Sequence, residues 1–221
     1  MLYIVATPIG NLKDISLRAL EVLKEVDLIA AEDTRQTRKL TQHYAINTPL
    51  TSYFEHNKLK KGDFLLGLLK QGQKIALVSD AGTPGISDPG YHLINLAIKN
   101  SIPLTAIPGS TALIVALSLS GMPTHKFVFE GFLPPKEVGR RKRLKDLSQE
   151  TRTIVVYESP HRLVKCLKDI IEVLNDPIVA CCRELTKKFE EIKREKASIL
   201  LDHFNKNKPR GEFVLIFNPT F

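Results

Sequence analysis

The chain has 221 residues, of which 43% are hydrophobic and 25% are charged; this composition excludes disordered and fibrous proteins. The length allows two modest domains or one extended α/β domain. The formal net charge of +8 is uneven, because residues 1–120 carry 12 Lys/Arg and 10 Asp/Glu whereas the rest carries 20 and 14. A basic second half favours a polyanionic partner, since neutralising phosphates releases counterions.

Segments that would indicate export, a membrane span or a metal site are not recognisable in the sequence. No charged leader or cleavage site accompanies the apolar segment at residues 1–8, and the longest apolar stretch, residues 111–119, is too short to cross a bilayer. Cys166, Cys181 and Cys182 have neither disulfide nor zinc spacing. Cys181 and Cys182 lie in the apolar run 178–182, so we expect them to be small buried hydrophobes. These features predict a cytoplasmic protein without a metal.

Hydrophobic patterning in the first half predicts short strands that alternate with helices. In chain order, the predicted elements are a strand at 2–6, a helix at 17–26, strands at 28–31 and 74–79, a helix at 91–99 and a strand at 104–107. This alternation is typical of a parallel α/β sheet. Ser110 is predicted to cap a helix over 111–120, which Gly121 and Pro123 would end.

The end of that helix predicts a domain boundary near Gly121, with domains at 1–121 and 122–221. The second domain is predicted to contain strands at 127–132, 153–157, 178–183 and 213–217, and helices at 137–147 and 163–174. The predicted fold class is therefore α/β, with two α/β domains and a cleft between them. The first domain would supply ligand-binding loops, and the second would complete the cleft and add a basic surface.

Four loops after predicted strands are rich in small residues: residues 7–11, 79–90, 107–111 and 158–162. Ligands of open parallel sheets bind beyond the carboxyl ends of the strands, and glycine lets the backbone approach them closely. Glycine, proline and serine also make ordinary turns, so each loop alone has a purely structural interpretation. The first loop fits neither the dinucleotide-binding nor the P-loop template, which disfavours an NAD or ATP enzyme.

Seven motifs in order resemble the small-subunit rRNA ribose-2′-O methyltransferases of the tetrapyrrole-methylase superfamily. They are ATPIGNL at 6–12, AAEDTR at 30–35, VSDAGTPGISDPG at 78–90, IPGS at 107–110, EGFLP at 130–134, YESPHR at 157–162 and RELTK at 183–187. The resemblance covers nearly the whole chain. It implies 2′-O-methylation of a cytidine in the decoding region of 16S rRNA, S-adenosylmethionine held between the two domains, and a homodimer.

The resemblance also implies which residues contact S-adenosylmethionine. In the first domain these are Pro8, Gly10, Asp80, Ala81, Gly82, Thr83, Pro84, Pro108, Gly109, Ser110 and Thr111, and in the second they are Phe132, Leu133 and Pro134 near the adenine, with Glu184 and Gly211 nearby. Longer family members carry a helical C-terminal extension, whereas this chain ends at Phe221. We therefore expect RNA to be recognised by other surfaces here.

Methylation of a ribose hydroxyl requires alignment with the donor and a general base within hydrogen-bond reach. Acidic, basic and imidazole groups at predicted strand ends or in loops are the catalytic candidates: Glu32, Asp33, Arg35, His56, Glu158, His161, Arg162, Glu184 and Lys187. Structural alternatives stay open. Glu32 and Asp33 suit a helix N-terminus with an ion pair to Arg35 or Arg38, His161 suits a first helical turn, and Glu184 and Lys187 with Arg183 suit a solvated cluster.

A run of cations in the predicted helix at 137–147 favours RNA binding. It contains Lys136, Arg140, Arg141, Lys142, Arg143 and Lys145 against the single acid Glu137. A solvated helix face is the structural alternative.

Two further functions of the whole chain stay open: methylation of a tetrapyrrole or another small molecule on the same fold, and a noncatalytic RNA-binding assembly factor.

Overall fold

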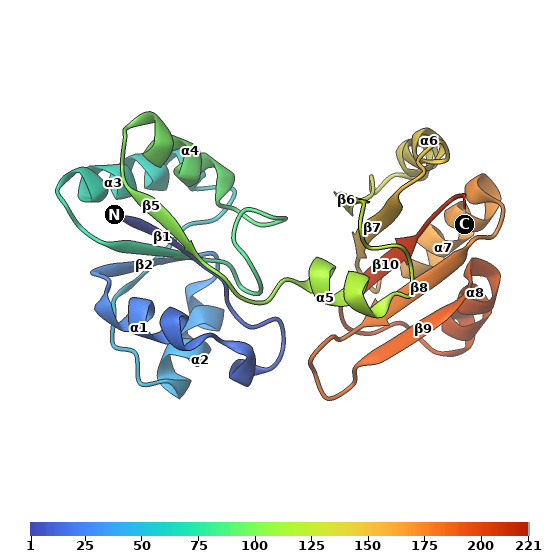
Figure 1. Ribbon diagram of the computed structural model, residues 1–221, viewed down its shortest axis with the longest axis horizontal. Coiled ribbons are helices and arrows are strands. Elements are labelled where there is room, and N and C mark those ends of the chain that lie inside the picture. Colours follow the sequence, from blue (N-terminus) through green and yellow to red (C-terminus); the bar gives the residue numbers. More distant parts are fainter. Residues whose placement is uncertain (221) are drawn as a thin grey trace. The chain divides into compact units, whose positions relative to one another are not determined.

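The computed structural model describes residues 1–220, which form two compact α/β units (Figure 1). The first unit is Met1–Thr111 and the second begins at Ala112. The division therefore precedes helix α5 (Ala112–Leu119), whereas the sequence placed it after that helix, at Gly121. Helix α5 packs against strands β7 (Thr153–Glu158) and β10 (Phe213–Phe217), which accounts for its place in the second unit.

The first unit contains a five-stranded parallel sheet in the order β3-β2-β4-β1-β5. Its strands are β1 (Leu2–Val5), β2 (Leu28–Ala31), β3 (Leu50–Ser52), β4 (Ile75–Val78) and β5 (Leu104–Ile107). The connections are a short 3-10 helix, η1 (Leu12–Asp14), and helices α1 (Leu17–Glu25), α2 (Thr34–His43), α3 (Lys58–Lys70) and α4 (Tyr91–Lys99). The predicted parallel sheet is confirmed.

Helices cover both faces of this sheet, with α1 and α2 on one side and α3 and α4 on the other (Figure 1). Neighbouring strand residues belong to different hydrophobic clusters: Val5 and Ala76 face α1 and α2, whereas Ile4 and Leu77 face α3 and α4. Successive side chains of a strand point to opposite faces, so a sheet buried on both sides reads as a continuous apolar run.

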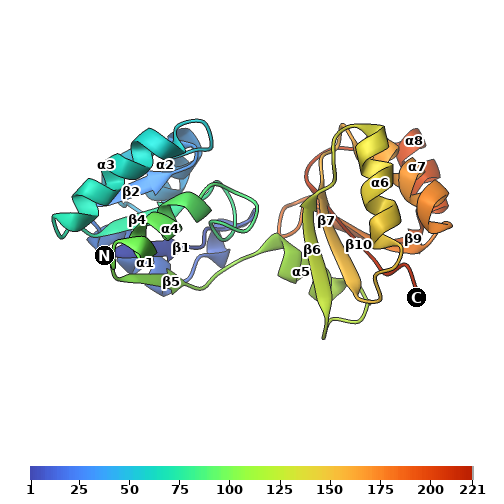
Figure 2. The same ribbon diagram turned by 90° about the horizontal axis from the view of Figure 1, so that it is seen from above.

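The second unit contains a mixed sheet in the order β6-β7-β10-β8-β9. Its remaining strands are β6 (Phe127–Phe132), β8 (Ile178–Arg183) and β9 (Glu191–Lys196). β6 and β7 are parallel, and the other neighbours are antiparallel. Helices α6 (Glu137–Leu147), α7 (Leu163–Leu174) and α8 (Ala197–Lys206) cover one face, and α5 covers the other (Figure 2).

Six elements were not predicted, namely η1, α2, β3, α3, β9 and α8. β9 has the sequence EIKREK and lies at the edge of its sheet, where charged side chains protect against association with other strands. α2 is polar along most of its length. The helix expected over 111–120 runs from Ala112 to Leu119, so Ser110 lies two residues before it rather than at its start.

Among residues 1–220, no helix is both long and apolar enough to span a membrane. All three cysteines are free and buried, which confirms the burial predicted for Cys181 and Cys182.

Candidate functional site

Three of the four predicted loops meet at the carboxyl edge of the first sheet, where they follow β1, β4 and β5. Thr7 and Gly82 exchange two backbone hydrogen bonds, at 2.9 and 3.0 Å. The Thr7 hydroxyl donates to the Ser79 carbonyl at 3.1 Å. The first and second loops are therefore held together through their backbones.

The third loop joins the same group through hydroxyls. The oxygens Thr83 Oγ1 and Thr111 Oγ1 lie 2.7 Å apart, and Thr83 Oγ1 donates to the Ser110 carbonyl at 3.3 Å. Exposure varies among the predicted cofactor contacts: Gly10, Asp80, Ala81, Pro108 and Gly109 are exposed, Pro8, Thr83, Ser110 and Thr111 are half-buried, and Gly82 and Pro84 are buried.

Two glycines in these loops have conformations or neighbours that exclude larger residues. A Cβ atom at Gly109 would lie 2.8 Å from the Cβ of Ala6, closer than real side chains approach. Gly82 has a φ of +83°, which L side chains rarely adopt. The backbone can therefore adopt this arrangement only with glycine, or with considerable strain, at positions 82 and 109.

Acidic groups lie at the same edge, after β2 and β4. The Asp33 N–H donates to Asp80 Oδ1 at 3.0 Å, and the Asp80 N–H donates to Glu32 Oε2 at 3.3 Å. Burial, reinforced for Glu32 by Asp88, Asp80 and Asp33, raises the pKa of Glu32 and of Asp80. The structure thus brings Glu32, Asp33 and Asp80 together beside the loops.

Asp33 also has the structural role that the sequence left open. It is the N-cap of α2, and its carboxylate accepts hydrogen bonds from the Arg35 N–H at 2.8 Å and from the Arg35 guanidinium at 2.6 Å. These bonds lower the pKa of Asp33 to about 2.

Another catalytic candidate of the first unit, His56, follows β3. Its side chain is exposed and packs edge-to-face against Phe54.

In the second unit, the end of β6 and the residue after it combine an exposed aromatic ring with a buried leucine. Phe132 is 54% exposed and its ring centroid lies 5.8 Å from that of Tyr157, whereas Leu133 is 1% exposed. The Tyr157 hydroxyl accepts a hydrogen bond from the Leu113 N–H at 3.1 Å. Tyr157, which the site prediction omitted, therefore links the segment to α5.

Glu158 cannot serve as a catalytic group in this arrangement, because its side chain is 0% exposed. It accepts a hydrogen bond from the Ser159 N–H at 2.8 Å and pairs with Arg162 at 3.3 Å. Arg162 in turn donates to the Leu133 carbonyl at 2.5 Å. This corrects the catalytic prediction for Glu158. Arg162 is half-buried and His161 is exposed, so their catalytic roles stay predictions.

Glu184 and Lys187 form the ion-paired cluster that was their structural alternative. Lys187 Nζ lies 2.9 Å from Glu184 Oε1 and 2.8 Å from Glu212 Oε2. Burial alone would raise the pKa of Glu184, but hydrogen bonds from Lys187 and the Glu212 N–H outweigh it and lower that pKa. Gly211, at φ +88°, leaves room for the Glu184 side chain, because a Cβ there would lie 2.4 Å from it.

The arginines of α6 are neutralised by acids from other elements. Arg140 is 2% exposed and its Nη2 lies 2.5 Å from Asp169 Oδ2, so it cannot reach an RNA phosphate. Arg141 pairs with Asp169 at 2.7 Å, and Arg143 pairs with Glu130 at 2.6 Å. These contacts correct the RNA prediction for Arg140 and weaken it for the other two, while Lys136, Lys142 and Lys145 are exposed.

Asp169, the buried partner of Arg140 and Arg141, was not singled out from the sequence, although a signal was present. It lies in the buried stripe of α7, beside Cys166 and Ile170. A carboxylate in such a stripe requires a buried partner.

In the described residues 1–220, no group of three or more His, Cys, Asp or Glu side chains could hold a metal ion.

Known proteins with similar sequences belong to one family of methylases. The profile of the family Tetrapyrrole (Corrin/Porphyrin) Methylases matches residues 1–200. A protein of Thermotoga maritima named ribosomal RNA small subunit methyltransferase I is 49% identical over 217 residues, which cover 98% of this chain and 97% of that protein. A protein of the same name from Escherichia coli O157:H7 is 51% identical over 97% of this chain and 76% of its own length.

Solved structures share the fold at low identity. Diphthine synthase matches with a TM-score of 0.78 at 12% identity, over 98% of this chain and 88% of its own. Uroporphyrin-III C-methyltransferase from Thermus thermophilus, solved with S-adenosyl homocysteine, matches with a TM-score of 0.68 at 18% identity, over 98% and 96% of the two chains. The predicted α/β fold class, with one sheet in each of two units, and the family resemblance are confirmed.

Proposed function

Because the chain belongs to the tetrapyrrole (corrin/porphyrin) methylase family, we propose that it transfers a methyl group from S-adenosylmethionine to RNA of the small ribosomal subunit. The proposal of this substrate rests on sequence identity. About half of the residues, over nearly the whole chain, are identical to those of proteins named for that reaction. The acceptor that we propose is the 2′-hydroxyl of a cytidine in the decoding region of 16S rRNA.

The edge of the first sheet suits S-adenosylmethionine. Gly10, Ala81 and Gly109 are exposed there, so a ligand can approach the backbone without meeting large side chains. The carboxylates of Glu32 and Asp80 complement the positive sulfonium and can accept hydrogen bonds from ribose hydroxyls. Phe132 of the second unit offers an exposed ring against which an adenine can stack. We propose that the two units hold the cofactor between them.

When bound, S-adenosylmethionine supplies an electrophilic methyl group, and the protein must align the acceptor hydroxyl and remove its proton. Glu32 is our candidate for the general base. Burial and neighbouring acids raise its pKa, which makes its carboxylate a stronger proton acceptor than an ordinary glutamate. Glu158 is excluded from this role because solvent does not reach its side chain.

RNA recognition and assembly complete the proposal. Lys136, Lys142 and Lys145 are exposed on or beside α6, and they are the part of the predicted RNA surface that remains available to phosphates. We also propose a homodimer, as the family resemblance implies, and a cytoplasmic location, which the free, buried cysteines suit.

The test is methyl transfer to small ribosomal subunits purified from a strain that lacks the enzyme. Labelled S-adenosylmethionine should label the RNA, and mapping of 2′-O-methyl groups should locate one cytidine. Labelling of a tetrapyrrole instead of RNA would favour the small-molecule methyltransferases that share this fold. RNA binding without transfer to either would favour an assembly factor.

A further inference from the structure

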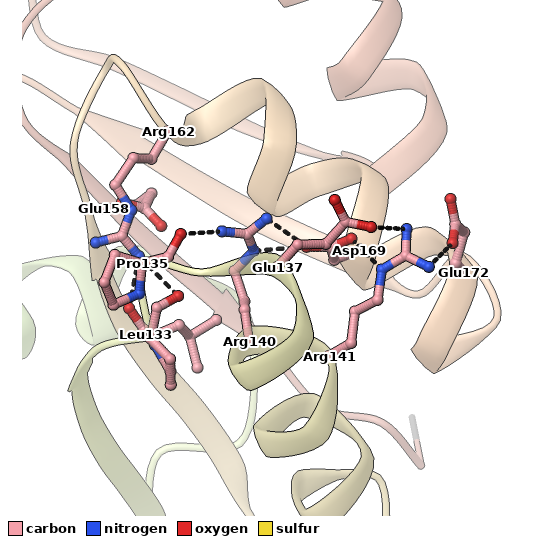
Figure 3. Close-up of polar contacts among 10 residues, drawn as sticks. Leu133, Pro135, Glu137, Arg140, Arg141, Glu158, Arg162, Asp169 and Glu172 are labelled. Atoms are coloured by element: carbon pink, nitrogen blue, oxygen red, sulfur yellow. Dashed lines mark hydrogen bonds and ion pairs between the residues drawn. The ribbon is translucent and has the colours of Figure 1, made fainter.

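Two arginines of the second unit converge on the backbone that follows Phe132 (Figure 3). Arg162 Nη2 donates to the Leu133 carbonyl at 2.5 Å and to the Pro134 carbonyl at 3.4 Å. Arg140 Nη1 donates to the Pro135 carbonyl at 3.1 Å. Three consecutive carbonyls are thus bound by guanidinium groups from two different helical regions, one at the start of α7 and one in α6.

Each arginine is paired with a buried carboxylate. Arg162 lies 3.3 Å from Glu158, whose side chain is 0% exposed. Arg140 donates from Nε to Asp169 at 2.6 Å, and the side chains of these two residues are 3% and 2% exposed. Charges are seldom buried unless they are paired and hydrogen-bonded, as Arg140 and Asp169 are. Arg162 is half-buried, and it is held by the ion pair with Glu158 and by its bonds to the backbone carbonyls.

The sequence of the segment explains why it needs such support. Pro134 and Pro135 have no N–H groups, so this backbone cannot be anchored as a hydrogen-bond donor at these positions. Its carbonyls are the polar groups left for attachment, and a guanidinium fork can bind two of them at once. A lysine, with one charged nitrogen, cannot reproduce the geometry.

The geometry points to Arg162 and Glu158 as positioning residues that hold residues 132–134 as a preformed wall of the cofactor site. This inference rests on the proposed function, in which Phe132 faces the adenine. Arg162 binds the backbone and Glu158 orients Arg162, so neither needs to touch the cofactor. Arg140 and Asp169 extend the same support to Pro135.

A fluorescent reporter can test the segment directly, because the chain contains no tryptophan. Phe132→Trp places a single indole at an exposed position of the segment. We expect Arg162→Met in this reporter chain to lower the indole anisotropy in the free protein. The matched control is Arg152→Met, which breaks the exposed ion pair with Glu150 in the same unit and should leave the anisotropy unchanged.

Calorimetry with S-adenosylhomocysteine then tests the functional part. Arg162→Met should weaken binding about tenfold or more, since it removes hydrogen bonds made by a charged group. The KM for S-adenosylmethionine should rise while the KM for RNA stays constant. Arg162→Lys should fall between Arg162→Met and wild type, and Arg152→Met should bind like wild type.

The outcomes separate this inference from the proposed function. Lack of binding by the wild-type chain contradicts the proposed function, and the anisotropy still decides whether Arg162 fixes the segment. Unchanged anisotropy in folded Arg162→Met overturns the inference, as does normal affinity in a chain whose segment has become mobile. If Arg162→Met fails to fold, Glu158→Gln decides by the same two measurements, because it removes the charge that orients Arg162 while preserving the side-chain shape.

Discussion

The carboxyl edge of the first sheet and the segment after β6 are built by opposite means. At the first, loops are joined by backbone bonds such as the Thr7–Gly82 pair, and the close approach of Gly109 to Ala6 depends on a missing side chain. At the second, two arginines with buried acid partners hold a proline-rich backbone. A site wall can thus be fixed by backbone shape or by buried charge. Mutations in the two regions should therefore differ in their effects on stability and on cofactor binding.

The largest effect is expected from breaking the charged support. Asp169→Ala leaves Arg140 buried without its partner and removes a partner of Arg141. Loss of one member of a buried pair costs about 3–5 kcal/mol, so we expect the free energy of unfolding to fall by that amount. Urea denaturation measures it. Arg152→Ala, which removes the exposed partner of Glu150, is the control and should change stability by less than about 1 kcal/mol; equal losses would show that burial of the pair contributes little.

The next effect is expected from adding volume where the backbone is tightly packed. Gly109→Val should abolish measurable cofactor binding and cost about 1–3 kcal/mol of stability, because its Cβ meets Ala6. Gly67→Ala is the matched control: a Cβ there meets nothing within 4 Å, and alanine in the α3 interior should add up to about 1 kcal/mol. Normal cofactor affinity in folded Gly109→Val would remove this loop from the site.

A smaller and opposite change is expected at the acidic groups. The folded-state pKa of Glu32 is raised, so its contribution to stability is present below its unfolded pKa and is lost as pH rises through the folded value. Glu32→Gln should therefore be slightly more stable than wild type at neutral pH, and its stability should depend less on pH in the acid range. Its rate of methyl transfer should be much lower. Thermal denaturation from pH 4 to 8 and single-turnover assays measure both quantities. Full activity in the variant would contradict the assignment of Glu32 as the base.

The same comparison explains what the sequence could and could not predict. The loops at the first edge follow strands of a parallel sheet, so their meeting place follows from periodicity and from the rule on strand ends. The support of Leu133 could not be found in this way, because Arg162 and Glu158 are far from it in the sequence and their charges suggested chemistry. The role of Arg140 was misinterpreted for the same reason: its partner Asp169 comes from another element, as does Glu130, the partner of Arg143.

The smallest effect is expected where the cations of the α6 region are exposed. Replacing Lys136, Lys142 and Lys145 with alanine should leave the free energy of unfolding and the affinity for S-adenosylhomocysteine unchanged, since these side chains lie outside both the buried pairs and the loops. RNA affinity should fall, and the slope of its logarithm against log salt should decrease by about 0.7 for each single-strand phosphate contact removed. Arg140→Ala is the informative contrast, because we expect it to destabilise the fold while leaving the salt slope intact. A wild-type salt slope in the triple variant would place the RNA contacts elsewhere, whereas a lower slope in folded Arg140→Ala would mean that this arginine leaves its pair with Asp169 to bind phosphate.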